Sequence, residues 1–108
     1  MSVIEEKPNE ILNESIHHKW LHDDSFENLY DFNKFINWLS GEFTLYQQDE
    51  FHGLTVFIPN GWFSIEQLSL NKNVIEFRIE VKSKCFKSGV KIFNQVKLIL
   101  KHFKSKVI

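Results

Sequence analysis

Hydrophobic residues recur at three- and four-residue steps near the start of this 108-residue chain, and that spacing predicts amphipathic helices. The first predicted helix begins at Asn9, after a polar arm over residues 1–9. Its apolar stripe consists of Ile11, Leu12, Ile16, Trp20 and Leu21. Within this segment Ser15, His17 and His18 are mediocre helix formers.

A second helix is predicted directly after the first. Asp24 or Ser25 is a suitable N-cap, and Glu27 stands three residues after Asp24, as in a capping box. The apolar stripe comprises Phe26, Leu29, Phe32, Phe35, Ile36 and Leu39. Gly41 follows the stripe and is predicted to end the helix as a C′ residue with positive φ.

After Gly41 the hydrophobic period changes to two, which is the period of side chains on one face of a strand. Strands are predicted over residues 42–48, 54–58, 62–70 and 75–82, with a turn at 71–73. Asn60-Gly61 predicts a hairpin with a type I′ turn, because both residues tolerate positive φ. In the last strand apolar and polar residues alternate, which is typical of an antiparallel sheet with one buried face.

A third helix closes the chain, with Ser88 as the predicted N-cap. Its apolar stripe runs from Ile92 to Phe103, and lysines occupy the other face. The order α-α-β-β-β-β-α predicts an α+β fold in which a four-stranded antiparallel β-meander packs against two N-terminal helices and one C-terminal helix. Residues 1–108 are predicted to form a single domain.

Composition agrees with a packed domain, since 43% of the residues are hydrophobic and 15% are aromatic. No apolar run approaches the roughly 18 residues of a membrane helix. The first residues also lack the pattern of a signal peptide. Cys85 is the only cysteine, so no internal disulfide can form. These features predict a cytoplasmic protein.

Charge is unevenly distributed along the chain although the net charge is only −1. Residues 1–51 hold eleven Asp and Glu against three Lys, a balance of −8. Residues 52–108 hold ten Lys and Arg against three Glu, a balance of +7. Clustered charge steers association, so the asymmetry concerns binding partners more than the fold.

The most site-like short segment contains several histidines. On a helix, His18 and His22 would share one face at the spacing by which two imidazoles bind one metal ion. Asp23 or Asp24 could add an oxygen ligand. However, Lys19 occupies the position where a zinc-protease motif has Glu. A solvated helix end is the simpler interpretation, so no metal or cofactor is predicted, and a metal-dependent enzyme stays a second alternative.

Other catalytic signals are weak. Cys85 lies between Lys84 and Lys87, which favour its thiolate, but nothing fixes a histidine beside it. The four glycines are spread along the chain, so no glycine-rich phosphate loop is present. We therefore expect no enzyme activity and predict no catalytic residue.

The basic part of the chain suggests a nucleic-acid or anion-binding module that uses the lysine-rich C-terminal helix. Arg78 is nevertheless the only arginine, and arginine is the residue that forks onto phosphates and reads guanine edges. Lysines on the outer face of an amphipathic helix also serve solubility. Nucleic-acid binding is thus an alternative and not the main prediction.

Carboxylates gather around the second predicted helix and the ends of the strand that follows it, namely Asp23, Asp24, Glu27, Asp31, Glu42, Asp49 and Glu50. If Gly41 turns the chain back beside that helix, these groups merge into one negative patch. Its predicted border has amphipathic aromatic residues of the type that anchors interfaces, namely Tyr30, Trp38 and Tyr46.

The sequence therefore predicts a small, non-catalytic, cytoplasmic protein-binding module. Its small size and local acidity are typical of an immunity or antitoxin-type inhibitor of the bacterial kind, which docks an acidic face on a basic toxin or nuclease. No membrane partner is predicted. The opposite charges of the two halves and the two sheet edges also allow a homodimer.

Overall fold

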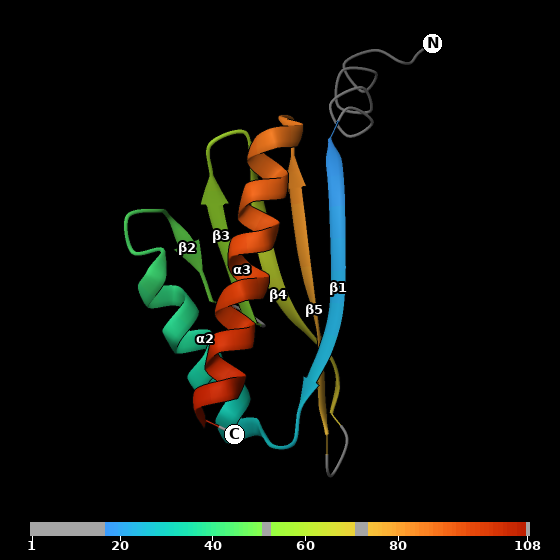
Figure 1. Ribbon diagram of the computed structural model, residues 1–108, viewed down its shortest axis with the longest axis vertical. Coiled ribbons are helices and arrows are strands. Elements are labelled where there is room, and N and C mark those ends of the chain that lie inside the picture. Colours follow the sequence, from blue (N-terminus) through green and yellow to red (C-terminus); the bar gives the residue numbers. More distant parts are fainter. Residues whose placement is uncertain (1–16, 51–52, 71–73, 108) are drawn as a thin grey trace.

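The computed structural model describes residues 17–50, 53–70 and 74–107. Its elements, labelled in Figure 1, are β1 (His18–Phe26), α2 (Leu29–Glu42), β2 (Gln48–Asp49), β3 (Gly53–Ile58), β4 (Gly61–Leu70), β5 (Ile75–Ser83) and α3 (Phe86–Val107). The strands form one sheet in the order β1-β5-β4-β3-β2, and every neighbouring pair is antiparallel.

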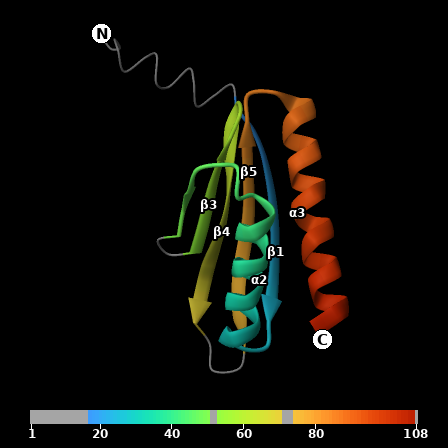
Figure 2. The ribbon, with the colours of Figure 1, turned by 90° about the vertical axis from the view of Figure 1, so that its left-hand side faces the viewer.

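Both described helices lie on the same side of the sheet, which gives two layers (Figures 1 and 2). We call this side of the sheet the covered face and the opposite side the open face. The predicted α+β class is confirmed. The predicted arrangement of four strands and three helices does not match, because the described residues form five strands and two helices.

The additional strand is β1, where the sequence pattern predicted the end of a helix. That prediction is wrong from His18 onward, and residues 9–16 of the predicted helix lie outside the described part of the chain. β1 pairs with β5 in unbroken register from His18↔Ser83 to Phe26↔Ile75. The ladder with β5 satisfies one side of the β1 backbone, and tertiary pairing of this kind outweighs a weak local preference for helix.

Helix α2 begins later than predicted. Its N-cap is Asn28, whose side-chain oxygen accepts a hydrogen bond of 2.8 Å from the backbone N–H of Asp31. Asp24 and Ser25, the predicted caps, lie on β1 instead. Four residues of the predicted stripe are buried on the helix, namely Phe32, Phe35, Ile36 and Leu39. Leu29 is 46% exposed, and Phe26 is buried but lies on β1.

The C-terminal end of α2 also differs from the prediction. Gly41 lies inside the helix without a positive φ, and the C-cap is Phe43. Residues 43–47 turn instead of forming the first predicted strand, and only Gln48–Asp49 pairs with β3. The side chain of Gln48 donates hydrogen bonds to the carbonyls of Ser40 (3.0 Å) and Phe43 (2.7 Å). Each carbonyl also accepts a backbone hydrogen bond, from Phe43 and Tyr46 respectively, so the Gln48 amide adds a second bond to each and holds the turn against the helix.

The β3–β4 hairpin is confirmed, but its turn differs from the predicted type. Ile58 pairs with Gly61, so the loop consists of Pro59 and Asn60. Asn60 has φ 72°, whereas Pro59 is restricted to negative φ. Proline in the second position and positive φ in the third are the features of a type II turn. The turn predicted at 71–73 lies outside the described residues.

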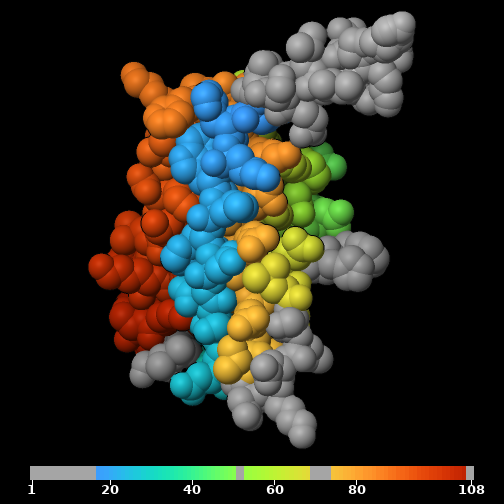
Figure 3. Space-filling view, turned by 90° about the vertical axis from the view of Figure 1, so that its right-hand side faces the viewer, coloured from blue at the N-terminus to red at the C-terminus, as the bar shows by residue number. Residues whose placement is uncertain are grey.

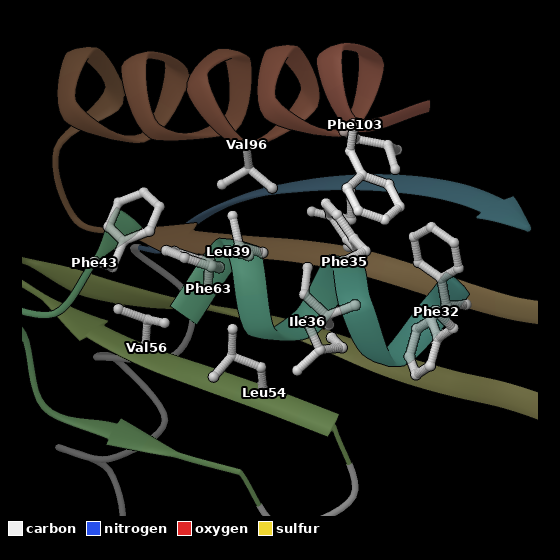
Figure 4. Packing of buried hydrophobic residues seen from close by; sticks show 14 of the residues in the cluster. Phe32, Phe35, Ile36, Leu39, Phe43, Leu54, Val56, Phe63, Val96 and Phe103 are labelled. Carbon is white, nitrogen blue, oxygen red and sulfur yellow. The ribbon is translucent and has the colours of Figure 1, made fainter. Parts of the chain in front are cut away.

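The predicted alternation in β5 is confirmed, since the odd-numbered residues from Ile75 to Ser83 are buried on the covered face. Helix α3 begins at Phe86, two residues before the predicted N-cap Ser88. Aromatic rings from four elements form the centre of the core. The ring of Phe26 lies 5.4 Å from that of Phe77 and 5.6 Å from that of Phe103. Figure 4 shows α2 side chains between α3 and the sheet.

Candidate functional site

The structure distributes the predicted acidic residues over several surfaces instead of one face. Asp23 and Asp24 are neighbours on β1, so their side chains point to opposite faces of the sheet. Asp23 lies on the open face and accepts hydrogen bonds of 2.7 and 3.0 Å from Arg78. Asp24 lies on the covered face, 2.8 Å from Nζ of Lys104. Both carboxylates are paired with a cation inside the domain.

These cations change the ionisation of the two carboxylates. The hydrogen bond from Arg78 is the main reason why the pKa of Asp23 is lowered. For Asp24, partial burial opposes ionisation, but hydrogen bonds from Lys104 and the Ser25 backbone outweigh burial and lower the pKa. At neutral pH both carboxylates are therefore ionised and paired with a cation of the same domain.

The other predicted acidic residues lie at opposite ends of α2. Glu27 and Asp31 are near its start with Tyr30, whereas Glu42 is its last residue. A 14-residue helix is about 21 Å long, so these two groups do not form one patch. Among the predicted aromatic anchors, Tyr30 is 68% exposed at the start of α2. Trp38 packs on the core instead, with its ring 5.2 Å from that of Phe103.

At the C-terminal end of α2, part of the predicted face does come together. Glu42 ends the helix, and Asp49 and Glu50 lie in and directly after β2. The Ser40 hydroxyl joins these segments, because it contacts Glu50 at 3.4 Å and also binds Gln48. Tyr46, in the turn between them, is 40% exposed. Gln48 faces α2, so its neighbour Asp49 on β2 points to the open face instead. We call Glu42 and Glu50 the acidic rim.

Beside the acidic rim lies an apolar groove of about 400 Å³. It is bounded by the turn after α2, the β3–β4 hairpin and the N-terminal half of α3. Its apolar walls come from Phe43, Leu45, Tyr46, Ile58, Pro59 and Ile92. Glu42 and Lys91 add one charge of each sign to its lining. A concave apolar surface with a few polar groups is the usual form of a binding site.

Leu45 is the most exposed large hydrophobic residue of the described chain, at 94%. The turn that presents it is firmly held. The Phe43 ring packs 4.9 Å from that of Phe63 in the core, and the backbone N–H of Phe57 donates to the Gln47 carbonyl at 2.9 Å. Leu45 is thus an apolar side chain presented to solvent by an ordered turn, which lowers the entropic cost of docking.

The sequence pattern did not identify this groove. It placed Leu45 and Phe43 on one face of the predicted strand 42–48, but only Phe43 is buried. Ile58 was assigned to a strand that stops at Pro59, and Ile92 to the apolar stripe of a helix, without a shared site. The alternating segment around Leu45 is rich in polar residues and short, and such segments also occur in turns.

The structure does not provide the helical metal geometry considered for His18 and His22. Both lie on β1, where residues four apart are separated by about 13 Å. Nε2 of His22 is 3.5 Å from Asp24, whereas the ring of His18 packs edge-on against Phe86 at 5.4 Å. Within residues 17–50, 53–70 and 74–107 no cluster of three or more metal-ligating side chains occurs.

Cys85 lies directly before α3. Its pKa is lowered, mainly through hydrogen bonds with the side chain and backbone of Ser88, and to a smaller extent through Lys87. A lowered thiol pKa was also expected from the flanking lysines, but its principal cause is hydrogen bonding to Ser88 in the first turn of α3.

Lysines of α3 line a second groove of about 450 Å³, which lies between this helix and β1. The α3 side chains include Lys97, Lys101 and Lys104, and those from β1 are His22 and Asp24. The covered face of β1 therefore meets part of the predicted basic surface.

In sequence comparisons the chain matches no family model and no curated protein. Neither α2 nor α3, the helices of the described chain, is long and apolar enough to span a membrane.

Proposed function

We propose that this protein is a non-catalytic binding module that docks on a basic protein surface through the apolar groove and the acidic rim. The observation that carries the proposal is Leu45, 94% exposed on an ordered turn beside a groove of about 400 Å³. An exposed apolar side chain next to a concave apolar wall is suited to an interface anchor.

The chemistry of the partner follows from the surroundings of the groove. Glu42 and Glu50 favour a partner with lysine or arginine around an apolar side chain that enters the groove. The apolar contact slows dissociation, and the carboxylates accelerate encounter at low salt. A basic toxin or nuclease has such a surface, so an immunity or antitoxin-type inhibitor is the particular form of this proposal.

Two pairs of variants test the docking surface. The full chain is used to capture its partner from the native cell, and the affinity is then measured with the purified partner. Burying a leucine contributes about 1.5–3 kcal/mol, so Leu45→Ser should weaken binding roughly 10- to 100-fold. Leu29→Ser is the matched control, because Leu29 is 46% exposed at the other end of α2.

The electrostatic part has its own control. Glu42→Gln combined with Glu50→Gln should slow association at low salt and reduce its salt dependence. Glu27→Gln, an exposed carboxylate at the start of α2, should leave association close to wild type. If a nuclease is captured, an equimolar amount of this protein should suppress its activity. Unchanged affinity in Leu45→Ser and in the Glu42/Glu50 double variant would refute the proposal.

A further inference from the structure

The outer edge of β1 is a free sheet edge as far as the described residues extend. β1 is at the end of the strand order, and no described strand pairs with its outer side. It is nine residues long, whereas the strand at the opposite edge, β2, has two. Its register with β5 contains no bulge, and its sequence contains no proline. Such an edge presents backbone N–H and C=O groups to an incoming strand.

Helix α3 runs alongside this edge. Its contacts with β1 extend from Gly89 beside Trp20 to Lys104 beside Asp24. Figure 3 shows β1 at the surface next to the helix. The groove of about 450 Å³ lies between them, so a strand added to β1 would have one row of side chains beside α3.

The charge of the groove indicates which side chains fit. Lys104 is held by Asp24 and the Ser25 carbonyl, each at 2.8 Å. Lys97 and Lys101 form no salt bridge with another residue of the described chain, and the ammonium of Lys97 lies 4.9 Å from the centre of the Phe93 ring. They are four residues apart and hence about 6 Å apart along the helix. Alternate side chains on one face of a strand are about 6.6 Å apart, which nearly matches this spacing.

We propose that β1 and this groove bind an extended acidic peptide segment, which adds a sixth strand to the sheet. Its backbone pairs with the outer edge of β1, and two carboxylates at alternate positions contact Lys97 and Lys101. Side chains of the opposite row lie beside Lys19 and Leu21 on the open face. Main-chain pairing supplies affinity in this mode of recognition, and the alternate side chains supply specificity.

A second copy of the chain fits this edge less well. Pairing of two β1 strands about a twofold axis would bring the lysines of both α3 helices to the same groove. Like charges at close range disfavour that arrangement. The groove therefore selects an acidic strand in preference to the protein itself, and this surface is separate from the groove at Leu45.

A random dodecapeptide phage library panned against the full-length protein tests the proposal. The enriched sequences should carry Asp or Glu at alternate positions. For the best synthetic peptide, measured by fluorescence anisotropy, Lys101→Glu should weaken binding at least tenfold, and Lys97→Glu should act in the same direction. Lys87→Glu is the matched control at the other end of α3 and should change affinity less than twofold. N-methylation of alternate peptide residues should abolish binding, because it removes the backbone donors.

Several results would overturn the proposal. They include enriched peptides without alternating acidic residues, full affinity in both groove variants, and unchanged binding of the N-methylated peptide. Circular dichroism of each variant verifies that a loss of affinity is not a loss of fold. A stable dimer in sedimentation that Leu21→Lys dissociates would assign the edge to a second copy. Competition by single-stranded DNA, with N-methylated and normal peptide binding equally, would assign the groove to nucleic acid.

Discussion

Two glycines in helices, Gly41 in α2 and Gly89 in α3, should respond in opposite ways to the same substitution. Apart from its chain neighbours and the backbone of its own helix, an alanine at Gly41 would have no atom within 4 Å of its Cβ. An alanine at Gly89 would place its Cβ 2.2 Å from two ring atoms of Trp20 and 3.1 Å from Cβ of Ser83. Gly41→Ala and Gly89→Ala therefore compare helix propensity alone with propensity plus a steric clash.

The expected magnitudes follow from these contacts. Replacing glycine by alanine inside a helix stabilises by about 0.5–1 kcal/mol, and Gly41→Ala should show this gain. At Gly89 the Trp20 ring cannot move freely, because it packs against the rings of Phe86 (5.6 Å) and Phe93 (6.5 Å). Overpacking costs about 1–3 kcal/mol, so Gly89→Ala should lower the free energy of unfolding by about 1–2 kcal/mol.

Equilibrium unfolding in urea, followed by circular dichroism, measures both effects if the m-value is unchanged. Trp20→Phe supplies the rescue, since the smaller ring leaves room for the new methyl group. In a double-mutant cycle, Gly89→Ala should be at least about 1 kcal/mol less destabilising in the Trp20→Phe background. If Gly89→Ala destabilised the protein for a reason other than the clash with Trp20, the loss in free energy of unfolding would be the same in both backgrounds.

The same measurements can refute the reasoning. Stabilisation by Gly89→Ala would show that α3 does not approach Trp20 this closely. Destabilisation by Gly41→Ala would show that Gly41 needs positive φ, as the sequence pattern predicted, and that α2 ends before it. The pair of glycines thus tests both the helix–sheet distance and the helix boundary.

Three further predictions concern the core, the carboxylate of Asp24 and the cysteine. Phe103→Ala should lower the free energy of unfolding by about 3–5 kcal/mol in urea titration, because a fully buried ring at the centre of the core is lost. Because the pKa of Asp24 is below its ordinary 3.8 in the folded state, its contribution is full above that pH and is lost as the pH falls through the folded value. As the pH falls below about 3.8, the free energy of unfolding measured in urea should therefore decrease less in Asp24→Asn than in the wild type. Alkylation of Cys85 by iodoacetamide, followed against pH, should have a higher midpoint in Ser88→Ala, because its strongest hydrogen bond is removed.

The local pattern predicted those elements whose apolar residues all face one packed layer. The α2 stripe from Phe32 to Leu39 and the alternation from Ile75 to Val81 are of this kind, because each of these apolar residues is buried. β1 was missed for the corresponding reason. Its covered face carries His22 and Asp24 between Trp20 and Phe26, so the period of two is not visible in hydrophobicity.

The candidate sites were harder to predict from the sequence than the helices and strands, because they depend on tertiary structure. The acidic residues of one sequence segment were expected to form one face, but alternation along β1 and the length of α2 separate them. The groove at Leu45 joins a turn, a hairpin and a helix that are distant in sequence. No local pattern contains such a juxtaposition, because it is created by the packing of α3 on the sheet.

The sequence by itself determined the α+β class, the β3–β4 hairpin and most of the core, because hydrophobic periodicity and turn chemistry act between near neighbours. The turn of that hairpin lies one residue earlier than the predicted Asn60-Gly61. The charge asymmetry was also visible in the sequence. The tertiary structure alone decided that residues 18–26 form a strand, since only β5 supplies the hydrogen-bonding partner. It also decided which charges remain for binding, because the long-range partners Arg78 and Lys104 pair with Asp23 and Asp24.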